Sequence, residues 1–286
     1  MKRPVLNMTK SLTCVLVLSV SIIITISNSS AYEGDIDFAY HGGAYAMGKS
    51  GAENDVIAQF WEIVLKTSGI KKNSIKVNNF VDENQLYNMM KDKRVIIAGV
   101  SHSFFARHES ELNLVPLVVP AIAGNTYISY CVFIQNNHPD IKKVGDLKGR
   151  KIAVPRYGDE WYYKKLLPDH VPKVFQAVKY PDNTSVITAV LYNKADAGVA
   201  SEYFLLNFFK LRPHLKDKIK TIIKTKKVLL PPIVCQKGRL TNDEKKGIIS
   251  VLLDAHNNNE MSFLLDLIGF SGFRRITADE IIGAVK

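Results

Sequence analysis

Small polar residues follow several short apolar segments of the sequence, at points where buried strands would end. His41, Ser101-His102-Ser103 and Ser201 each come directly after such a segment. Hydroxyl and imidazole groups both donate and accept hydrogen bonds, so they can hold a small polar ligand. With the aromatic and basic residues near other predicted strand ends, the candidate ligand-binding set is His41, Tyr45, Ser101, His102, Ser103, Tyr127, Arg156, Tyr157, Trp161, Ser201 and Tyr203.

Aromatic side chains are numerous at the same strand ends. They suggest a pocket in which rings stack on a larger organic ligand or hold a cation over their faces. The alternative is that they are ordinary core or surface aromatics. The residues concerned are Tyr40, Tyr45, Tyr157, Trp161, Tyr162 and Tyr203.

The sequence lacks the common signatures of catalysis. It contains no nucleophile elbow, Walker loop, dinucleotide fingerprint or paired catalytic carboxylates. His41-Gly42-Gly43 is similar to an oxyanion motif, but no Gly-x-Ser-x-Gly accompanies it. The 7 histidines are scattered, and no Cys/His cluster has metal-ligand spacing. We therefore expect a binding protein rather than an enzyme, without a metal or a cofactor.

The elements that must position these residues alternate between strand and helix, which is typical of parallel α/β sheets. In such sheets, ligands bind at the carboxyl ends of the strands, where loops lead into helices. Capping boxes at Thr241–Glu244 and Thr277–Glu280 predict an all-helical tail. Strands are predicted at 36–40, 75–80, 94–100, 114–119, 127–135, 174–178, 196–200, 219–223 and 228–236, and helices from the capping box at Ser50 and at 82–91, 158–167, 183–192 and 202–209.

The first 31 residues have the pattern of a cleavable secretory signal peptide. Lys2, Arg3 and Lys10 precede an apolar run at 12–26, and small residues lead to Ala31, where we expect cleavage. The alternative is a membrane anchor, but a spanning helix needs about 20 predominantly apolar residues. The expected location is the periplasm.

The net charge of +11 is spread along the chain. A nucleic-acid surface would concentrate basic residues in one patch with aromatic residues between them. We therefore expect a basic soluble surface, a monomer and no nucleic-acid partner.

The middle of the chain resembles the type 2 periplasmic binding fold and, within it, the phosphate/phosphonate-type solute-binding family. The resemblance is carried by residues 127–134, by the turn Gly145-Asp146-Leu147-Lys148-Gly149, by 185–200 and by Pro231-Pro232-Ile233-Val234. It implies two α/β lobes, each a mostly parallel sheet flanked by helices, with a ligand cleft between them.

The lobes implied by the resemblance are 32–126 with 238–286, and 127–237. The implied hinge lies at Asn125-Thr126 and Lys237-Gly238, and the lobes would close over a small ligand. The implied function is substrate binding for an ABC importer, with a permease in the inner membrane as partner. The alternative is a binding module that reports to a membrane sensor or carries a lipid or metal complex.

One loop departs from the family pattern. Where phosphonate binders have a loop rich in Ser and Thr, this chain has Asp159 and Glu160 at a predicted helix start, beside Arg156. Carboxylates at this position repel a phosphate, although Arg156 can supply a charge-assisted pair. We therefore expect phosphate and simple phosphonates to bind weakly.

Cys131 and Cys235 remain after cleavage of the signal. In the family, the strands that carry them run side by side, and an oxidising compartment favours a disulfide if the two residues are in register. The alternative is two buried free thiols.

Overall fold

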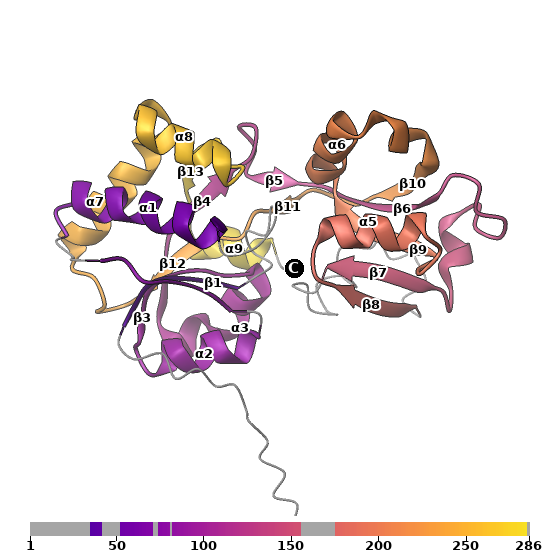
Figure 1. Ribbon diagram of the computed structural model, residues 1–286. Helices are drawn as coiled ribbons and strands as arrows, with labels where there is room; N and C mark the ends of the chain where they lie inside the picture. The colour runs from indigo at the N-terminus through magenta and orange to yellow at the C-terminus, as the bar shows by residue number, and fades with distance from the viewer. Residues whose placement is uncertain (1–34, 42–51, 71–73, 81, 156–174, 285–286) are drawn as a thin grey trace, which may run out of the picture. The chain divides into compact units, whose positions relative to one another are not determined.

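The computed structural model describes residues 35–41, 52–70, 74–80, 82–155 and 175–284 (Figure 1). In this part of the chain the strands form a six-stranded sheet, a five-stranded sheet and a two-stranded sheet. Tyr45, Arg156, Tyr157, Trp161 and the acidic pair Asp159 and Glu160 lie outside the described residues, as do the signal peptide predicted at 1–31, the helix predicted at 158–167 and the start of the predicted capping box at Ser50.

The six-stranded sheet has the order β13-β4-β12-β3-β1-β2. Strands β1, β2, β3 and β4 run in one direction, whereas β12 and β13 run in the opposite direction. Helices cover both faces, which explains why the central strands read as continuous apolar runs. The bounds are β1 Ile36–His41, β2 Val77–Phe80, β3 Val95–Gly99, β4 Leu114–Ala121, β12 Ile233–Gln236 and β13 Gly272–Arg275.

Helices α1, α7 and α8 pack together, and α2, α3 and α9 form a second group in contact with the same sheet (Figure 1). In α1, Phe60 and Val64 lie four residues apart and are both buried, and Trp61 stacks on Phe38 of β1 with ring centroids 4.5 Å apart. The bounds are α1 Ala52–Thr67, α2 Glu83–Lys91, α3 His102–Leu112, α7 Asn242–Asp254, α8 Asn259–Leu267 and α9 Ala278–Gly283.

The five-stranded sheet has the order β10-β6-β9-β7-β8 and its own apolar core. Strands β7, β8 and β9 are parallel, and β6 runs antiparallel to β9. The bounds are β6 Tyr130–Gln135, β7 Lys151–Pro155, β8 Gln176–Tyr180, β9 Ala197–Ser201, β10 Ile219–Lys224, α5 Asn183–Leu191 and α6 Glu202–Leu211.

The turn that carries much of the resemblance precedes β7. The Asp146 carboxylate accepts hydrogen bonds from the backbone amides of Lys142 and Lys143 at 2.9 and 3.0 Å, and these bonds lower its pKa. Leu147 is fully buried, and Gly149 adopts a φ of +74°, which glycine tolerates best. The turn therefore serves the fold, because Asp146 bonds the backbone and Leu147 packs in the core.

Two short strands, β5 (Tyr127–Ile128) and β11 (Val228–Leu229), pair antiparallel to form the two-stranded sheet. They lie on the two segments of chain that connect the larger sheets (Figure 1). The strand predicted at 127–135 is therefore interrupted at Ser129, and the strand predicted at 228–236 is interrupted between Leu229 and Ile233.

Two expectations about chain organisation need correction. Strand β12 pairs with β3 and β4 in the six-stranded sheet, although the family resemblance implied that residues 127–237 all belong to the second lobe. The returning crossing segment thus includes β11, and Lys237-Gly238 follows a strand of the first sheet. The tail is also not all helical, because β13 pairs with β4 at the sheet edge.

Of the two alternatives for the cysteines, the structure has two buried free thiols and not the possible disulfide. Cys131 lies on β6 in the five-stranded sheet, Cys235 lies on β12 in the six-stranded sheet, and both are free thiols. A disulfide needs neighbouring Cα atoms, and these strands pair with different partners. Burial raises the pKa of both thiols, that of Cys235 to about 11.

Candidate functional site

The carboxyl ends of β1 and β3 meet at one edge of the six-stranded sheet. The parallel register sets Tyr40 opposite Gly99, so His41 and the residues after Gly99 lie at this edge. His41 is 8% exposed. The neighbouring strand β3 ends at Gly99, and helix α3 begins at His102. The structure thereby brings His41 and Ser101-His102-Ser103 to the same edge, as strand-end reasoning predicts.

Ser101 forms the N-cap of α3. Its hydroxyl oxygen accepts a hydrogen bond from the Phe104 amide at 3.0 Å and lies 2.9 Å from the Ser103 hydroxyl. The first turn of α3 contains no acidic residue. A helix start concentrates backbone N–H groups and carries a partial positive charge, so this end of α3 suits an anion.

The imidazole of His102 points into the protein. Its Nε2 lies 3.2 Å from the carbonyl oxygen of Leu230, and the side chain is 6% exposed. Burial lowers the pKa of His102 from its ordinary value near 6.5 to about 4. The ring is therefore neutral at pH 7, and Nε2–H donates to Leu230. This bond fixes the start of α3 to the returning crossing segment.

Three strands of the five-stranded sheet also end at one edge. Strands β7, β8 and β9 are parallel, and Ser201 at the end of β9 caps α6 by accepting from the Phe204 amide at 3.2 Å. The Glu202 amide donates to the Ser129 carbonyl at 2.8 Å, and the Glu202 carboxylate is 2.7 Å from Lys224 Nζ. Since a carboxylate occupies the first turn of α6, this helix start is less suited to an anion than that of α3.

Sequence reasoning missed Asn183 in the first turn of α5. The residue follows β8, is 6% exposed, and its side-chain oxygen Oδ1 has no hydrogen-bond partner among the described residues. Asp182 caps the helix by accepting from the Ser185 amide at 2.7 Å. The signal was available, because Asp182-Asn183 follows a predicted strand, but the pair reads as ordinary helix-start chemistry.

The remaining described candidates lie on or near the crossing segments. Tyr127, on β5, is 39% exposed and pairs with Leu229. Tyr203, in the first turn of α6, is half-buried and packs against apolar residues of the core that includes the six-stranded sheet.

The described residues contain no group of three or more His, Cys, Asp or Glu side chains arranged to hold a metal ion. None of their helices is both long enough and apolar enough to cross a membrane.

The sequence of residues 69–281 matches the family described as "ABC transporter, phosphonate, periplasmic substrate-binding protein". This match covers most of the chain. The protein belongs to the periplasmic phosphonate-type substrate-binding family. No curated protein matches it in sequence.

Solved structures show the same fold at low sequence identity. A binding protein of an ABC phosphonate transporter from Pseudomonas aeruginosa has a TM-score of 0.65 at 14% identity, covering 87% of this chain and 83% of its own. A Prochlorococcus marinus protein in complex with methylphosphonate has a TM-score of 0.68 at 12% identity, with coverage of 87% and 94%. A Xanthomonas citri protein bound to ATP has a TM-score of 0.67 at 14% identity, with coverage of 88% and 97%.

Membership in the phosphonate-type family establishes the general role of the chain. It is the periplasmic substrate-binding component of an ABC transporter, it has the two-lobed α/β fold of its neighbours, and it captures a small-molecule ligand for a permease partner. The family is one of binding proteins rather than enzymes.

Proposed function

We propose that the ligand is a small organic anion, larger than phosphate, whose acidic group binds at the start of α3. The single observation that carries this proposal is the composition of that helix start. Two serine hydroxyls accompany backbone N–H groups, and the first turn holds no carboxylate. Such a terminus stabilises a nearby negative charge by about 0.3–1 kcal/mol at the surface, and by about 2 kcal/mol when partly buried.

His102 has a positioning role in this proposal. Its neutral ring holds the first turn of α3 against Leu230, so the N–H groups stay aligned without a competing positive or negative charge. His41 at the end of β1 supplies a further polar group at the same edge of the sheet. The solved neighbours support an anionic ligand, since their bound molecules include methylphosphonate, ATP and chloride.

The other lobe supplies the groups that recognise the organic part of the ligand. Asn183 offers a buried acceptor, and Ser201 and Tyr203 begin α6. Tyr127 contributes an exposed ring on a crossing segment. Tyr45, Arg156, Tyr157 and Trp161 complete the proposed set from sequence. The protein is exported through a signal peptide that is cleaved near Ala31. It acts as a monomer and does not bind nucleic acid.

The α3 assignment is tested by Ser101→Asp. Aspartate is a good N-cap, so the helix remains, but its carboxylate occupies the anion position. We expect the variant to lose about 100-fold in affinity for ATP or for a large organophosphonate that binds the wild type, because like charges in contact cost several kcal/mol. Isothermal titration calorimetry measures the change. In the wild type, inorganic phosphate and methylphosphonate should bind more weakly than the larger anion.

The matched control is Thr241→Asp. Thr241 caps α7 with the same geometry, accepting from the Glu244 amide at 3.2 Å, and it follows β12, which runs opposite to β3 and so ends at the other edge of the sheet. This control should bind as the wild type does. If Ser101→Asp binds the anion with the same affinity as the wild type, the proposed binding of the acidic group at the start of α3 is wrong.

A further inference from the structure

The edge of the five-stranded sheet at which β7, β8 and β9 begin gathers segments that are distant in sequence. Helices α5 and α6 follow β8 and β9 and run back along the sheet, so their last turns lie at this edge (Figure 1). Gln135, at the end of β6, donates from its side chain to the Leu191 carbonyl oxygen of α5 at 2.7 Å. The Asn136 amide donates to the Lys218 carbonyl oxygen at 2.9 Å, where the short 3₁₀ helix Pro213–Lys218 leads into β10.

This edge is strongly cationic. Residues 136–151, 192–196 and 212–219, which form it, contain nine Lys and Arg residues against four carboxylates. The last turns of α5 and α6 add about half a negative charge each, which is small beside this excess. Six of the lysines are exposed and are here called the basic end: Lys143, Lys148, Lys151, Lys194, Lys216 and Lys218.

Structural contacts occupy three of the four carboxylates. Asp146 accepts from two backbone amides of its own turn, and Asp140 lies 3.5 Å from Arg150. Asp196 accepts from the Lys151 amide at 2.8 Å and lies 3.8 Å from Arg150. Within the described residues, no lysine side chain of the basic end has a carboxylate within ion-pair distance. The basic end therefore presents unpaired positive charge to solvent.

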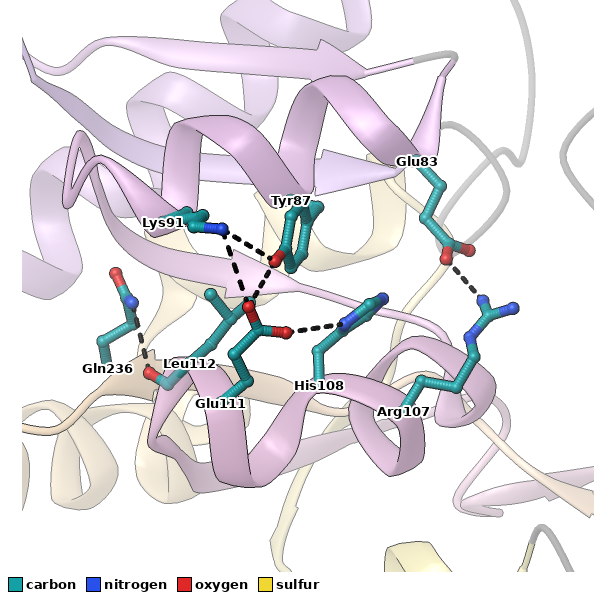
Figure 2. Close-up of polar contacts among 8 residues, drawn as sticks. All are labelled: Glu83, Tyr87, Lys91, Arg107, His108, Glu111, Leu112 and Gln236. Carbon is teal, nitrogen blue, oxygen red and sulfur yellow. Dashed lines mark hydrogen bonds and ion pairs between the residues drawn. The ribbon is translucent and has the colours of Figure 1, made fainter.

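The six-stranded lobe carries its charge differently. On α2 and α3, Arg107 pairs with Glu83, and Lys91 lies 3.7 Å from the Glu111 carboxylate (Figure 2). Residues 247–273, which include α8, contain three carboxylates and neither Lys nor Arg. Charge is thus unevenly distributed over the surface, with the basic end at one extreme and α8 at the other.

Two large apolar side chains are exposed beside the basic end. Tyr192, at the end of α5, is 72% exposed, and Leu211, at the end of α6, is 77% exposed. The guanidinium of Arg212 lies 4.7 Å from the centre of the Phe208 ring, which holds a further positive charge next to Leu211. Aromatic and aliphatic side chains among basic residues are typical of surfaces that adsorb to anionic membranes.

We propose that the basic end adsorbs to the surface of a bilayer that contains anionic phospholipid. Such a surface attracts each Lys and Arg that lies within about one Debye length of it. Tyr192 and Leu211 enter the headgroup region, where apolar side chains leave water. The composition favours lipid over a protein partner, because protein interfaces are depleted of lysine.

Adsorption has a consequence for transport. The family places the chain in the periplasm, with a permease in the membrane as its partner. A protein held at the membrane surface meets the permease at a higher effective concentration than one in solution. The starts of α5 and α6 lie at the other end of the same strands, so adsorption leaves them accessible to ligand. The proposal rests on the periplasmic location and not on the ligand assigned to α3.

Co-sedimentation of the exported protein with vesicles tests the proposal. Phosphatidylcholine vesicles that contain about 30% phosphatidylglycerol should bind the wild type at least about tenfold more tightly than pure phosphatidylcholine vesicles. About 1 M NaCl should release the protein, because the Debye length falls to about 3 Å. Lys216→Glu with Lys218→Glu should weaken binding at least about tenfold, and Leu211→Ser about threefold.

The matched charge control is Lys237→Glu with Lys246→Glu, which changes the net charge equally at two exposed lysines of the six-stranded lobe. The matched apolar control is Leu267→Ser on α8, where the leucine is 55% exposed. Both controls should bind vesicles as the wild type does. Equal effects of the two double reversals, equal binding to both vesicle types, or binding that survives high salt would overturn the proposal. An acidic protein as the true partner would appear as no sedimentation with either vesicle, which would overturn it too. If a variant fails to fold, the comparison of vesicle types and salt still decides.

Discussion

The neutral state of His102 makes this residue a source of pH-dependent stability. Below pH 6.5 the unfolded chain binds a proton on this imidazole, whereas the folded chain does not bind it until about pH 4. The unfolded state therefore holds more protons in this interval, and the free energy of unfolding falls as the pH falls. The contribution is fully present above pH 6.5 and lost at about pH 4.

We predict that the wild-type protein loses about 3 kcal/mol of stability through His102 between pH 7 and pH 4. His102→Gln should lose less over the same interval, since a glutamine amide can donate to Leu230 without titrating. Urea unfolding followed by circular dichroism at both pH values measures the difference. Acid effects of the carboxylates are common to both proteins, so parallel pH profiles would contradict the assignment.

The places of individual residues at strand ends were predicted well, whereas their role in ligand binding stays a prediction. The strand-end argument located His41, Ser101-His102-Ser103 and Ser201 because helix N-termini follow parallel strands in α/β folds. It did not show that His102 points inward, because the direction of a side chain in a first turn depends on what packs over it. Leu230 lies 128 residues away in sequence. The unpaired side-chain oxygen of Asn183 could not be predicted for the same reason.

At the scale of elements, Gly198 on β9 shows how closely the smaller core is packed. A Cβ at this position would lie 2.6 Å from Cζ of the Phe133 ring and 3.0 Å from Val186 Cγ1. Both neighbours are fully buried. The glycine thus allows the Phe133 ring and Val186 of α5 to pack together against the same face of β9.

Gly198→Ala should destabilise the five-stranded lobe by about 1–3 kcal/mol through overpacking. Thermal unfolding measured by calorimetry should show the loss. Gly145→Ala is the control in the same lobe, because its Cβ would meet a single flexible lysine carbon, Lys143 Cε, at 3.9 Å. A Gly198→Ala protein as stable as this control would mean that the ring moves aside without cost.

The alternation of strands and helices followed directly from hydrophobic periodicity, and the predicted capping boxes at Thr241 and Thr277 are both present. Hydrophobic periodicity did not predict which strands pair with each other. Strand β12 reads as one apolar run with β11, and periodicity carries no information about which sheet receives it. Strand β13 is short and carries two arginines, Arg274 and Arg275, so its pattern differs little from a loop. The choice between a Cys131–Cys235 disulfide and two free thiols stayed open in the sequence because it depends on that strand pairing.

At the scale of the whole molecule, the crossing segments suit a hinge. Strands β5 and β11 form a ladder of two residue pairs between the larger sheets, and the Tyr130 amide donates to the Thr225 hydroxyl at 2.9 Å beside it. Such a short ladder can flex while both sheets stay intact. We therefore propose that the lobes close over ligand about these segments.

Small-angle scattering should show a smaller radius of gyration when the wild type is saturated with its anion. The Ser101→Asp variant at the same ligand concentration provides the unbound reference and should not compact. An unchanged radius at proven saturation would argue against closure, even if the affinity measurements support the α3 site.

The position of β12 has a consequence for the order in which the two sheets can be completed. This strand lies between β3 and β4, yet more than a hundred residues separate it from β4 in sequence. The five-stranded sheet uses residues from Tyr130 to Lys224 alone, so all of its strands precede β12 in the chain. The six-stranded sheet keeps an open gap at its centre until β12 joins it. In a chain that enters the periplasm with its N-terminus first, the lobe that begins first is thus completed last.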